Sequence, residues 1–372
     1  MKAVIAAGGT AGHINPAIAI ADKIRQNEPD SKIIFVGRED GMEKRLVAEA
    51  GYDFHPIEIH GFSRSFKPSE IIFNLKSVKY AISALKKAKK LFEDFKPDIV
   101  IGCGGYVSGP VVRSAAKMGL KTAIHEQNSF PGVTTKMLSG LVDIIFVANS
   151  DIIPRLKNNE KCIITGNPVR EAFFEMNKAD ACSDINPDGK VCVVSFGGSL
   201  GAGETNEVAA QFIKLHHKTD KIIHYHATGQ YATKSFPDRL KELGIDYENN
   251  GNIVITDYIR NMPRYLSAAD LVLSRAGALT ISEIAASGTA SLLIPSPNVA
   301  ENHQYYNALT LADRDAAVLV EEGKIAPEEI AKKLFDLCQD PDKLAEMGRN
   351  ASKAEIKETS DIIYNKIIEL IG

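Results

Sequence analysis

The sequence predicts an α/β protein built from two doubly wound domains in tandem. The chain has 372 residues, which exceeds the size at which one hydrophobic core usually keeps growing. Short β-branched runs alternate with amphipathic stretches from one end to the other. A strand followed by a glycine-rich loop and a helix opens the chain and occurs again from residue 190. These observations favour two Rossmann-like sheets, each covered by helices.

The first half contains apolar runs separated by helical patterns. The predicted strands lie at 4–6, 33–36, 98–101, 122–124 and 144–147. Helical patterns cover 16–27 and 40–50, and another begins near residue 107. Asn15 and Pro16 have the composition of an N-cap and a first helical residue, so the first helix is expected to start there. The strands are continuously apolar, which is typical of a parallel sheet covered on both faces.

The second half repeats this organisation. Residues 177–189 are polar and rich in turn formers, so they are predicted to be a linker or a surface loop. The strands predicted beyond them lie at 190–196, 221–226, 252–256, 270–273, 291–295 and 316–320. The tail from about residue 325 is charged and helical, with no further strand expected.

Composition excludes several classes of protein. The net charge of −3 gives no global field toward nucleic acid, so no nucleic-acid partner is expected. The cysteines are scattered and lack CxxC spacing, which favours small buried thiols in a reducing compartment over disulfides or a zinc site. They are Cys103, Cys162, Cys182, Cys192 and Cys338.

The N-terminal segment does not resemble a targeting signal. It has one basic residue and a very short apolar run before the glycines, so no signal peptide is predicted. No run in the chain approaches the ~20 apolar residues of a membrane span. We therefore expect a cytoplasmic protein that is at most peripheral to a membrane.

Glycine loops follow the opening strand of each predicted domain. The first is residues 8–13 (GGTAGH), and the second is residues 197–202 (GGSLGA). Glycines let a ligand approach the backbone, and a helix N-terminus attracts an anion. Neither loop fits GxGxxG or a P-loop, which argues against a dinucleotide oxidoreductase and an NTPase. The loops favour an anionic or sugar-like ligand, but glycines needed only for strand-to-helix packing would give the same pattern.

Small or polar residues follow three other predicted strands. Residues 102–110 are glycine-rich, and residues 125–128 (HEQN) suit either a polyhydroxylated ligand or a capped polar loop. In the second half, small residues from Ser274 to Thr280 precede Glu283. A carboxylate at this place can accept from both hydroxyls of a ribose, but an acidic residue early in a helix is also favoured by the helix dipole alone.

Together these motifs resemble the MurG family of glycosyltransferases over almost the whole chain. The matching motifs are GGTAGH (8–13), GGYVSGP (104–110), HEQN (125–128), GNPVR (166–170), GGSLGA (197–202), SRAGALTISE (274–283) and NHQYYNA (302–308). The resemblance implies a GT-B glycosyltransferase fold, with two Rossmann-like domains facing across a cleft. It implies an N-terminal domain of residues 1–165 plus 350–372, and a C-terminal domain of residues 166–349.

The resemblance also implies an activity and its partners. The enzyme would be an inverting transferase that moves N-acetylglucosamine from UDP-N-acetylglucosamine to the muramyl sugar of lipid I, giving lipid II for peptidoglycan synthesis, cell shape and division. The donor would bind the C-terminal domain, and the acceptor would bind the N-terminal domain. No cofactor is implied. The implied location is peripheral, at the anionic cytoplasmic face of the membrane, with a cell-wall synthesis complex as a further partner.

The family motifs imply functions for particular residues. Ile259 would meet the uracil through its backbone, Glu283 would bind the ribose, and Ser199 would bind the diphosphate. The other residues implied on the donor side are Thr10, Gly12, Asn128, Arg170, Ala278, Leu279, Thr280, His303 and Gln304. The acceptor-side loops contain Gly104, Gly105 and Tyr106. The departures from the family pattern are Ala11, which could slightly reshape the acceptor side, and Leu200 and His303, which leave the assignment intact.

The transfer requires a base for the acceptor hydroxyl and stabilisation of the leaving diphosphate. His13 is the predicted base, because a pKa near 6.5 suits neutral pH; a histidine bonded to the loop backbone would instead be structural. Glu126 is the second candidate. The literal DxD match at 313–315 ends a helical pattern and is expected to be solvated. The 197–202 loop and its helix dipole are therefore expected to stabilise UDP, with no metal.

Residues 62–92 are predicted to contain the membrane contact. They interleave aromatic and aliphatic residues with basic ones, and Glu70 is their sole acid. The 62–76 end is expected to meet anionic headgroups, with Ile72, Phe73 and Lys76 at its centre. The alternative is a buried amphipathic helix with a solvated basic face.

Other functions would leave a similar pattern. A UDP-N-acetylglucosamine 2-epimerase would bind the same donor without a lipid acceptor. A transferase acting on diacylglycerol or a sterol fits less well, because the 104–110 and 125–128 motifs match MurG. A catalytically silent sensor or scaffold is disfavoured by His13, Glu283 and Gln304. Turnover in a purified assay distinguishes these alternatives.

Overall fold

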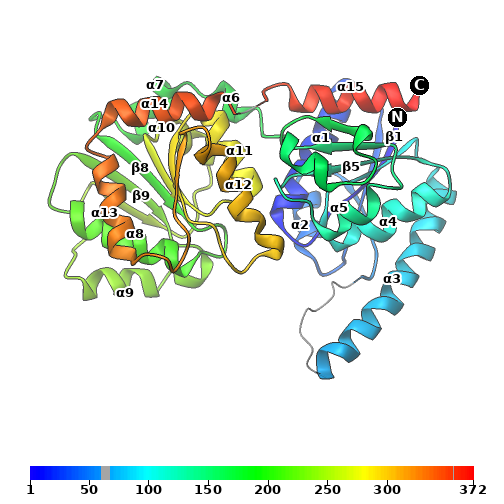
Figure 1. Cartoon of the computed structure of the whole chain (residues 1–372), viewed down its shortest axis with the longest axis horizontal. Coiled ribbons are helices and arrows are strands. Elements are labelled where there is room, and N and C mark those ends of the chain that lie inside the picture. The colour runs from blue at the N-terminus through cyan, green and yellow to red at the C-terminus, as the bar shows by residue number, and fades with distance from the viewer. Residues whose placement is uncertain (60–67, 355) are drawn as a thin grey trace. The chain divides into compact units, whose positions relative to one another are not determined.

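The computed structural model describes residues 1–59, 68–354 and 356–372, apart from the side chains of 68–79, 81 and 82. The chain separates into two compact units (Figure 1). Unit 1 contains Met1–Pro168 and Glu358–Gly372, and unit 2 contains Val169–Lys357. The predicted membrane contact around Ile72, Phe73 and Lys76 falls on residues 60–67 and on the side chains of 68–79, which lie outside this description.

Unit 1 contains a seven-stranded parallel sheet in the order β3-β2-β1-β4-β5-β6-β7. Its strands are β1 Lys2–Ala6, β2 Lys32–Gly37, β3 Asp53–Pro56, β4 Ile99–Gly102, β5 Lys121–Glu126, β6 Ile144–Val147 and β7 Cys162–Ile164. Its helices are α1 Ala11–Asn27, α2 Met42–Glu49, α3 Pro68–Phe95, α4 Gly105–Lys117, α5 Val133–Leu138 and α15 Thr359–Ile371. Apolar side chains of α1, α2 and α15 pack on one face, and those of α3, α4 and α5 pack on the other.

Unit 2 contains a six-stranded parallel sheet in the order β10-β9-β8-β11-β12-β13. Its strands are β8 Val191–Phe196, β9 Ile222–Ala227, β10 Ile253–Thr256, β11 Leu271–Ser274, β12 Ala290–Leu293 and β13 Ala317–Leu319. Its helices are α6 Ala172–Glu175, α7 Lys178–Ile185, α8 Gly203–His216, α9 Ser235–Glu242, α10 Met262–Ala268, α11 Ala278–Ser287, α12 His303–Ala312, α13 Pro327–Leu337 and α14 Pro341–Ser352.

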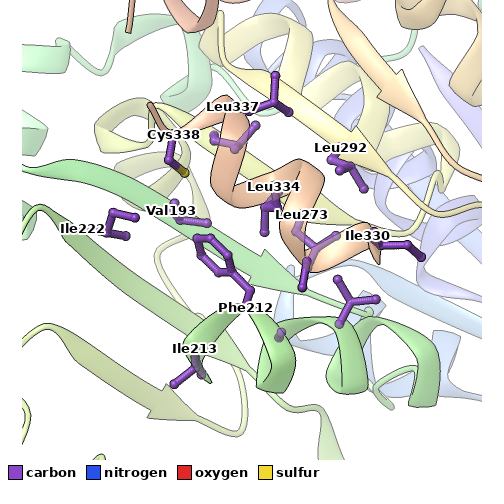
Figure 2. Close-up of a cluster of buried hydrophobic side chains, with 14 of the residues drawn as sticks. Val193, Phe212, Ile213, Ile222, Leu273, Leu292, Ile330, Leu334, Leu337 and Cys338 are labelled. Atoms are coloured by element: carbon purple, nitrogen blue, oxygen red, sulfur yellow. The ribbon is translucent and has the colours of Figure 1, made fainter. Parts of the chain in front are cut away.

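The core of unit 2 has a layer on each face of the sheet. Figure 2 shows the layer in which Phe212 of α8 and Leu334 of α13 meet Val193 and Leu273 from the strands. The other layer is built on α6, α7, α10, α11 and α12. Continuously apolar strands are therefore buried on both faces, which confirms the predicted pair of doubly wound α/β domains.

The first helix begins earlier than predicted. It starts at Ala11 after Thr10, not at Pro16, and Pro16 lies inside it. The reason is that the Thr10 carbonyl already accepts the N–H groups of His13 and Ile14, at 3.1 and 3.3 Å, which forms a turn before the proline. His13 therefore belongs to the first turn of α1 and is not at a loop tip.

The predicted linker at 177–189 is also wrong in part. Residues Lys178–Ile185 form α7, where the Asn177 side chain accepts from the N–H of Ala179 as an N-cap. Ala181 and Ile185, spaced four residues apart, are buried on one face of this helix. This short helix could not be predicted from the sequence, because two apolar positions are too few to show a helical pattern of hydrophobic residues.

The chain returns to unit 1 after α14 has ended. The Thr359 hydroxyl donates to the Thr165 carbonyl at 2.5 Å, and Lys23 of α1 pairs with Asp361 of α15 at 2.6 Å. All five cysteines are free thiols. Cys103, Cys192 and Cys338 are buried as predicted, whereas Cys162 and Cys182 are only half-buried, so the prediction of burial is wrong for these two. Within the described ranges, no helix has the length and apolar content needed to cross a membrane.

Candidate functional site

Each sheet reverses its strand order at one place, and the glycine loops lie there. In unit 1 the reversal falls between β1 and β4, and in unit 2 it falls between β8 and β11. Ligands of open parallel sheets bind beyond the carboxyl ends of the strands at this switch point. The predicted first glycine loop follows β1, and the predicted second glycine loop follows β8.

In unit 1, the loops after β1 and β4 touch through glycine backbone. Gly105 has φ +76°, and a Cβ there would overlap the Gly8 carbonyl oxygen. Gly9 has φ +88°, and a Cβ there would meet the Tyr106 ring at 3.3 Å. Both glycines are therefore required, because the left-handed backbone and the close approach exclude side chains. This contact brings together residues from two of the predicted motifs.

His13 lies in this contact with its ring oriented by the loop. Its Nδ1 lies 3.2 Å from the Gly8 carbonyl oxygen and 3.2 Å from the Thr10 hydroxyl. A carbonyl only accepts, so the bond to Gly8 assigns the proton to Nδ1 and makes Nε2 the basic nitrogen. A Cβ at Gly104 would lie 2.5 Å from His13 Cδ2 and 3.0 Å from Nε2, so a side chain at position 104 would collide with the ring.

Arg38 and Glu43, which the sequence analysis missed, also lie at this contact between the loops after β1 and β4. Arg38 donates to the Tyr106 hydroxyl at 3.3 Å and pairs with Asp40, whose hydrogen bond raises the pKa of the guanidinium. Glu43 is 1% exposed, and its carboxylate accepts the N–H of Arg38 at 2.9 Å and the N–H of Gly9 at 3.4 Å. Their only sequence signal is a charged run, 38–43, directly after the second predicted strand.

Glu126 holds the loop that follows β5. Its carboxylate accepts from Asn128 N–H at 3.1 Å, Asn128 Nδ2 at 3.0 Å, Gly132 N–H at 2.9 Å and the Thr135 hydroxyl at 2.5 Å. The side chain is 4% exposed. This geometry favours a positioning role for Glu126, because its lone pairs already receive donors from 128–135.

The side chains of His125 and Gln127 also form hydrogen bonds within unit 1. Nε2 of His125 lies 3.1 Å from the Gly166 carbonyl, and its Nδ1 accepts from Gln127 at 3.0 Å. Burial lowers the pKa of His125 to about 4, so the ring is neutral at physiological pH. Gln127 donates also to the Cys103 carbonyl at 3.0 Å, which ties the β5 loop to the β4 loop.

In unit 2, the second glycine loop packs on the loop that follows β9. A Cβ at Gly229 would overlap the backbone of Gly201, and Gly201 itself has φ +89°. The N–H of Gln230 donates to the Ser199 carbonyl at 3.2 Å, and Ser199 and Leu200 are exposed. Helix α8 starts at Gly203, so its first N–H groups lie at the end of an exposed glycine loop, an arrangement that binds anions.

Glu283 lies half-buried on α11, beyond β11. Burial raises the pKa of Glu283 to about 7, and the nearby charge of Arg170 partly opposes this shift. Arg170 is exposed, with its guanidinium 5.2 Å from the centre of the Phe173 ring. A carboxyl close to half-ionised at neutral pH gains charge when a ligand donates hydrogen bonds to it.

Apart from Thr10, Gly12 and Asn128, which lie in unit 1, the remaining residues predicted for the donor lie in unit 2. Ala278, Leu279 and Thr280 form the first turn of α11. Ile259, 4% exposed, follows β10, and His303 and Gln304 begin α12. Gln304 Oε1 accepts the N–H of Ser296 at 2.9 Å, and His303 Nδ1 lies 2.8 Å from the Ala300 carbonyl.

Acidic residues do not gather into a metal site in the described part of the chain. No group of three or more His, Cys, Asp or Glu side chains there is arranged to hold a metal ion. Asp313 is the C-cap of α12, and Asp313–Asp315 are exposed, so the DxD match is the solvated helix end that was predicted.

Two parallel sheets with glycine loops at their switch points are the architecture of the GT-B fold, which is the fold of this chain. Residues 3–147 match the N-terminal domain of glycosyltransferase family 28, and residues 191–363 match its C-terminal domain. The chain therefore belongs to glycosyltransferase family 28 and, through the relatives described next, to its MurG members.

Similar proteins cover the whole chain. A protein of Acetivibrio thermocellus named UDP-N-acetylglucosamine–N-acetylmuramyl-(pentapeptide) pyrophosphoryl-undecaprenol N-acetylglucosamine transferase is 38% identical over 100% of this chain and 98% of its own. The crystal structure of Acinetobacter baumannii MurG is 26% identical with a TM-score of 0.76, and covers 99% of both chains. A UDP-GlcNAc 2-epimerase from Neisseria meningitidis bound to UDP-GlcNAc has a TM-score of 0.70 at 15% identity, over 99% of this chain and 100% of that one, which is a likeness of fold alone.

Proposed function

We propose that this protein transfers N-acetylglucosamine from UDP-N-acetylglucosamine to the muramyl sugar of lipid I, giving lipid II. The observation that carries the proposal is the 38% identity, over the full length of the chain, to a relative with this activity in its name. The loops that contain or precede His13 and Ser199 follow β1 and β8, the strands at the two switch points, where ligands of such sheets bind, and this supports the proposal.

His13 is the proposed general base. The acceptor hydroxyl oxygen attacks the anomeric carbon of the donor, the bond from that carbon to the diphosphate oxygen breaks, and UDP leaves. The hydroxyl proton passes to Nε2 of His13, while the Nδ1–H group remains hydrogen-bonded to the Gly8 carbonyl oxygen. Gly104, Gly105 and Tyr106 would shape the acceptor side of this region, and Thr10, Gly12 and Asn128 would contact the donor. Glu126 acts by holding Asn128 and its loop, so we assign it a positioning function.

Unit 2 is the proposed donor-binding unit. The second glycine loop and the start of α8 would hold the diphosphate, with Ser199 as a hydroxyl donor. Glu283 would accept from the ribose hydroxyls, and Arg170 beside it would favour its ionised form. The backbone at Ile259 would meet the uracil, and Ala278, Leu279, Thr280, His303 and Gln304 would line the sugar.

The proposed location is the cytoplasmic face of the membrane, peripheral to an anionic surface, with a cell-wall synthesis complex as a partner. Support comes from the basic and apolar composition of 62–92. Lys86, Lys87, Lys89 and Lys90 are exposed on the described end of α3, whereas Ala84, Ala88 and Leu91 are buried.

The triple change Ile72→Ser, Phe73→Ser and Lys76→Glu tests this location. It should weaken binding to anionic vesicles at low salt, and unchanged binding would mean that the membrane contact lies elsewhere in the protein.

The decisive experiment is a transfer assay with the purified protein. UDP should be released only when lipid I is supplied with UDP-N-acetylglucosamine, and the product should contain both sugars. Conversion of the donor without lipid I would identify a 2-epimerase. Release of UDP with diacylglycerol or a sterol would identify another lipid acceptor, and no turnover with any acceptor would identify a binding protein.

A further inference from the structure

One peptide group connects a buried carboxylate to the imidazole of His13. The Gly8–Gly9 peptide uses its N–H to donate to Glu43 Oε2 at 3.4 Å. The carbonyl of the same peptide, on Gly8, accepts from His13 Nδ1 at 3.2 Å. The second oxygen of Glu43 accepts the N–H of Arg38 at 2.9 Å, which fixes the carboxylate beneath the loop.

The surroundings of Glu43 are shaped to keep the carboxylate in this place. Its side chain is 1% exposed and lies in the first turn of α2. A Cβ at Gly8 would lie 2.7 Å from Glu43 Oε1, and a Cβ at Gly37 would lie 2.5 Å from Glu43 Cγ. Within the described residues it has no ion-pair partner, so backbone N–H groups satisfy its charge. A buried carboxylate is costly unless hydrogen bonds or charges compensate it, so these two N–H groups are what holds Glu43 in place.

An amide transmits polarisation between its two hydrogen bonds. When the N–H donates to a carboxylate, the carbonyl oxygen becomes a stronger acceptor, because hydrogen bonds in series reinforce each other. A stronger acceptor at the Gly8 carbonyl favours the Nδ1–H tautomer of His13. It also stabilises the imidazolium that forms when Nε2 takes a proton, as a carboxylate does when it contacts a catalytic histidine directly.

We propose that Glu43 is a positioning residue of the transfer reaction, which acts on His13 through the Gly8–Gly9 peptide. The proposal rests on the proposed function, in which His13 is the general base. Glu43 touches neither substrate; it sets the tautomer of the base and supports its positive charge after proton transfer.

Glu43→Gln tests the proposal, because it keeps the shape of the side chain but removes the charge and one backbone acceptor. Turnover should fall by about 10- to 100-fold, the size expected for loss of a charged hydrogen bond. The acidic midpoint of the kcat/KM pH profile should move down by about 0.5–1 unit, because the positive charge on His13 loses support. Glu43→Asp, which keeps the charge, should retain the wild-type midpoint.

The matched control is Glu49→Gln on the same helix. Glu49 is exposed and pairs with Arg45 on the surface of the helix, at 3.1 Å. This variant removes the same charge from α2 and should leave turnover and the pH profile unchanged. UDP binding by calorimetry should be equal in wild type, Glu43→Gln and Glu49→Gln, which verifies that unit 2 is intact in each.

Two measurements separate this proposal from the function on which it rests. In the His13→Ala background, Glu43→Gln should cause no further loss of turnover, since its effect passes through His13. Nitrogen-15 NMR of the His13 ring should show the Nδ1–H tautomer in wild type and a mixture in Glu43→Gln. An equal loss in both backgrounds, or an unchanged tautomer, overturns the connection. Normal turnover of His13→Ala instead overturns His13 as the base, whatever the tautomer shows.

Discussion

The first and second glycine loops occupy the same place in the same topology, yet they differ in what lies behind them. The loop of unit 1 has a buried carboxylate, Glu43, under its peptide and an imidazole, His13, on the helix that follows. The loop of unit 2 rests on a second glycine backbone at Gly229 and leads into α8 with Ser199 exposed. A strand, a glycine loop and a helix therefore do not determine which ligand or reaction the loop serves. That depends on the residues that pack beneath the loop.

The two loops differ in whether the charges around them favour a bound anion. A buried carboxylate beneath the first loop disfavours an anion there. At the second loop, the nearest acid in the helix is Glu204, in the first turn of α8. Burial first, and then repulsion from Glu322, raise the pKa of Glu204, so its negative charge is disfavoured beside the helix N-terminus. This difference agrees with the proposed functions, which are proton transfer at the first loop and diphosphate binding at the second.

Replacing His13 should have the largest effect, because it should remove the function of the first loop and leave the second loop intact. His13→Ala should lower kcat by about 10²–10⁴-fold, the range for loss of a general base. The dissociation constant of UDP, measured by calorimetry, should hardly change, because the second loop is untouched. Near-normal kcat from pH 6 to 9 would move the base function to another residue, with Glu126 the first to be tested.

The packing of the two loops can be compared through single methyl groups. Gly105→Ala should destabilise the protein by about 3 kcal/mol or more, because it combines left-handed strain with overlap on the Gly8 carbonyl. Gly198→Ala should cost only about 1–2 kcal/mol, since φ is +94° but nothing lies within 4 Å of the added Cβ. Thermal unfolding measures both. Equal losses would mean that the unit 1 contact is absent in solution.

The sequence predicted the sheets well, and it predicted single contacts poorly. Largely apolar strands such as β4 (99–102) and β8 (191–196) are visible because burial on both faces leaves few polar residues in them. Glycine loops at strand ends are equally visible. The edge strands β3 and β7 were not predicted, because they are short and β3 contains Asp53 and His55. A strand at the edge of a sheet needs less apolar surface.

Side-chain partners of the site depend on contacts between distant segments. Glu43 meets Gly9 across 34 residues of sequence, so a charged run after β2 gave no sign of its burial. Residues 125–128 were expected either to meet a ligand or to cap a loop. His125, Glu126 and Gln127 are buried and hydrogen-bonded within unit 1, because β5 continues to Glu126 in a sheet that is covered on both faces. Such partners follow from tertiary packing, which no local pattern records.

Glu283 tests the donor side of the comparison with a smaller effect. Glu283→Ala should raise the donor KM by about 10- to 100-fold and lower kcat much less, since the ribose bonds are equally present in ground and transition states. Wild-type affinity for UDP should increase from pH 6 to 8, because ionisation of a group with a pKa of about 7 improves its acceptor strength. Glu283→Gln should bind weakly with no such slope. An unchanged donor KM in Glu283→Ala would remove this residue from the site.

Chelation should have the smallest effect, and it addresses the second loop directly. The diphosphate develops charge as UDP leaves, and that charge needs a positive partner. The start of α8 offers backbone N–H groups at the end of the second loop, while Arg275 is already committed to Glu322 at 2.5 Å and to the Ile294 carbonyl at 3.0 Å. Turnover should stay within about twofold after EDTA treatment, because a helix N-terminus provides its partial charge without an ion. The control is the same protein returned to excess Mg²⁺. A full loss on chelation that Mg²⁺ or Mn²⁺ restores would show that the helix end alone does not stabilise UDP, and the two loops would then differ by a bound cation as well as by Glu43.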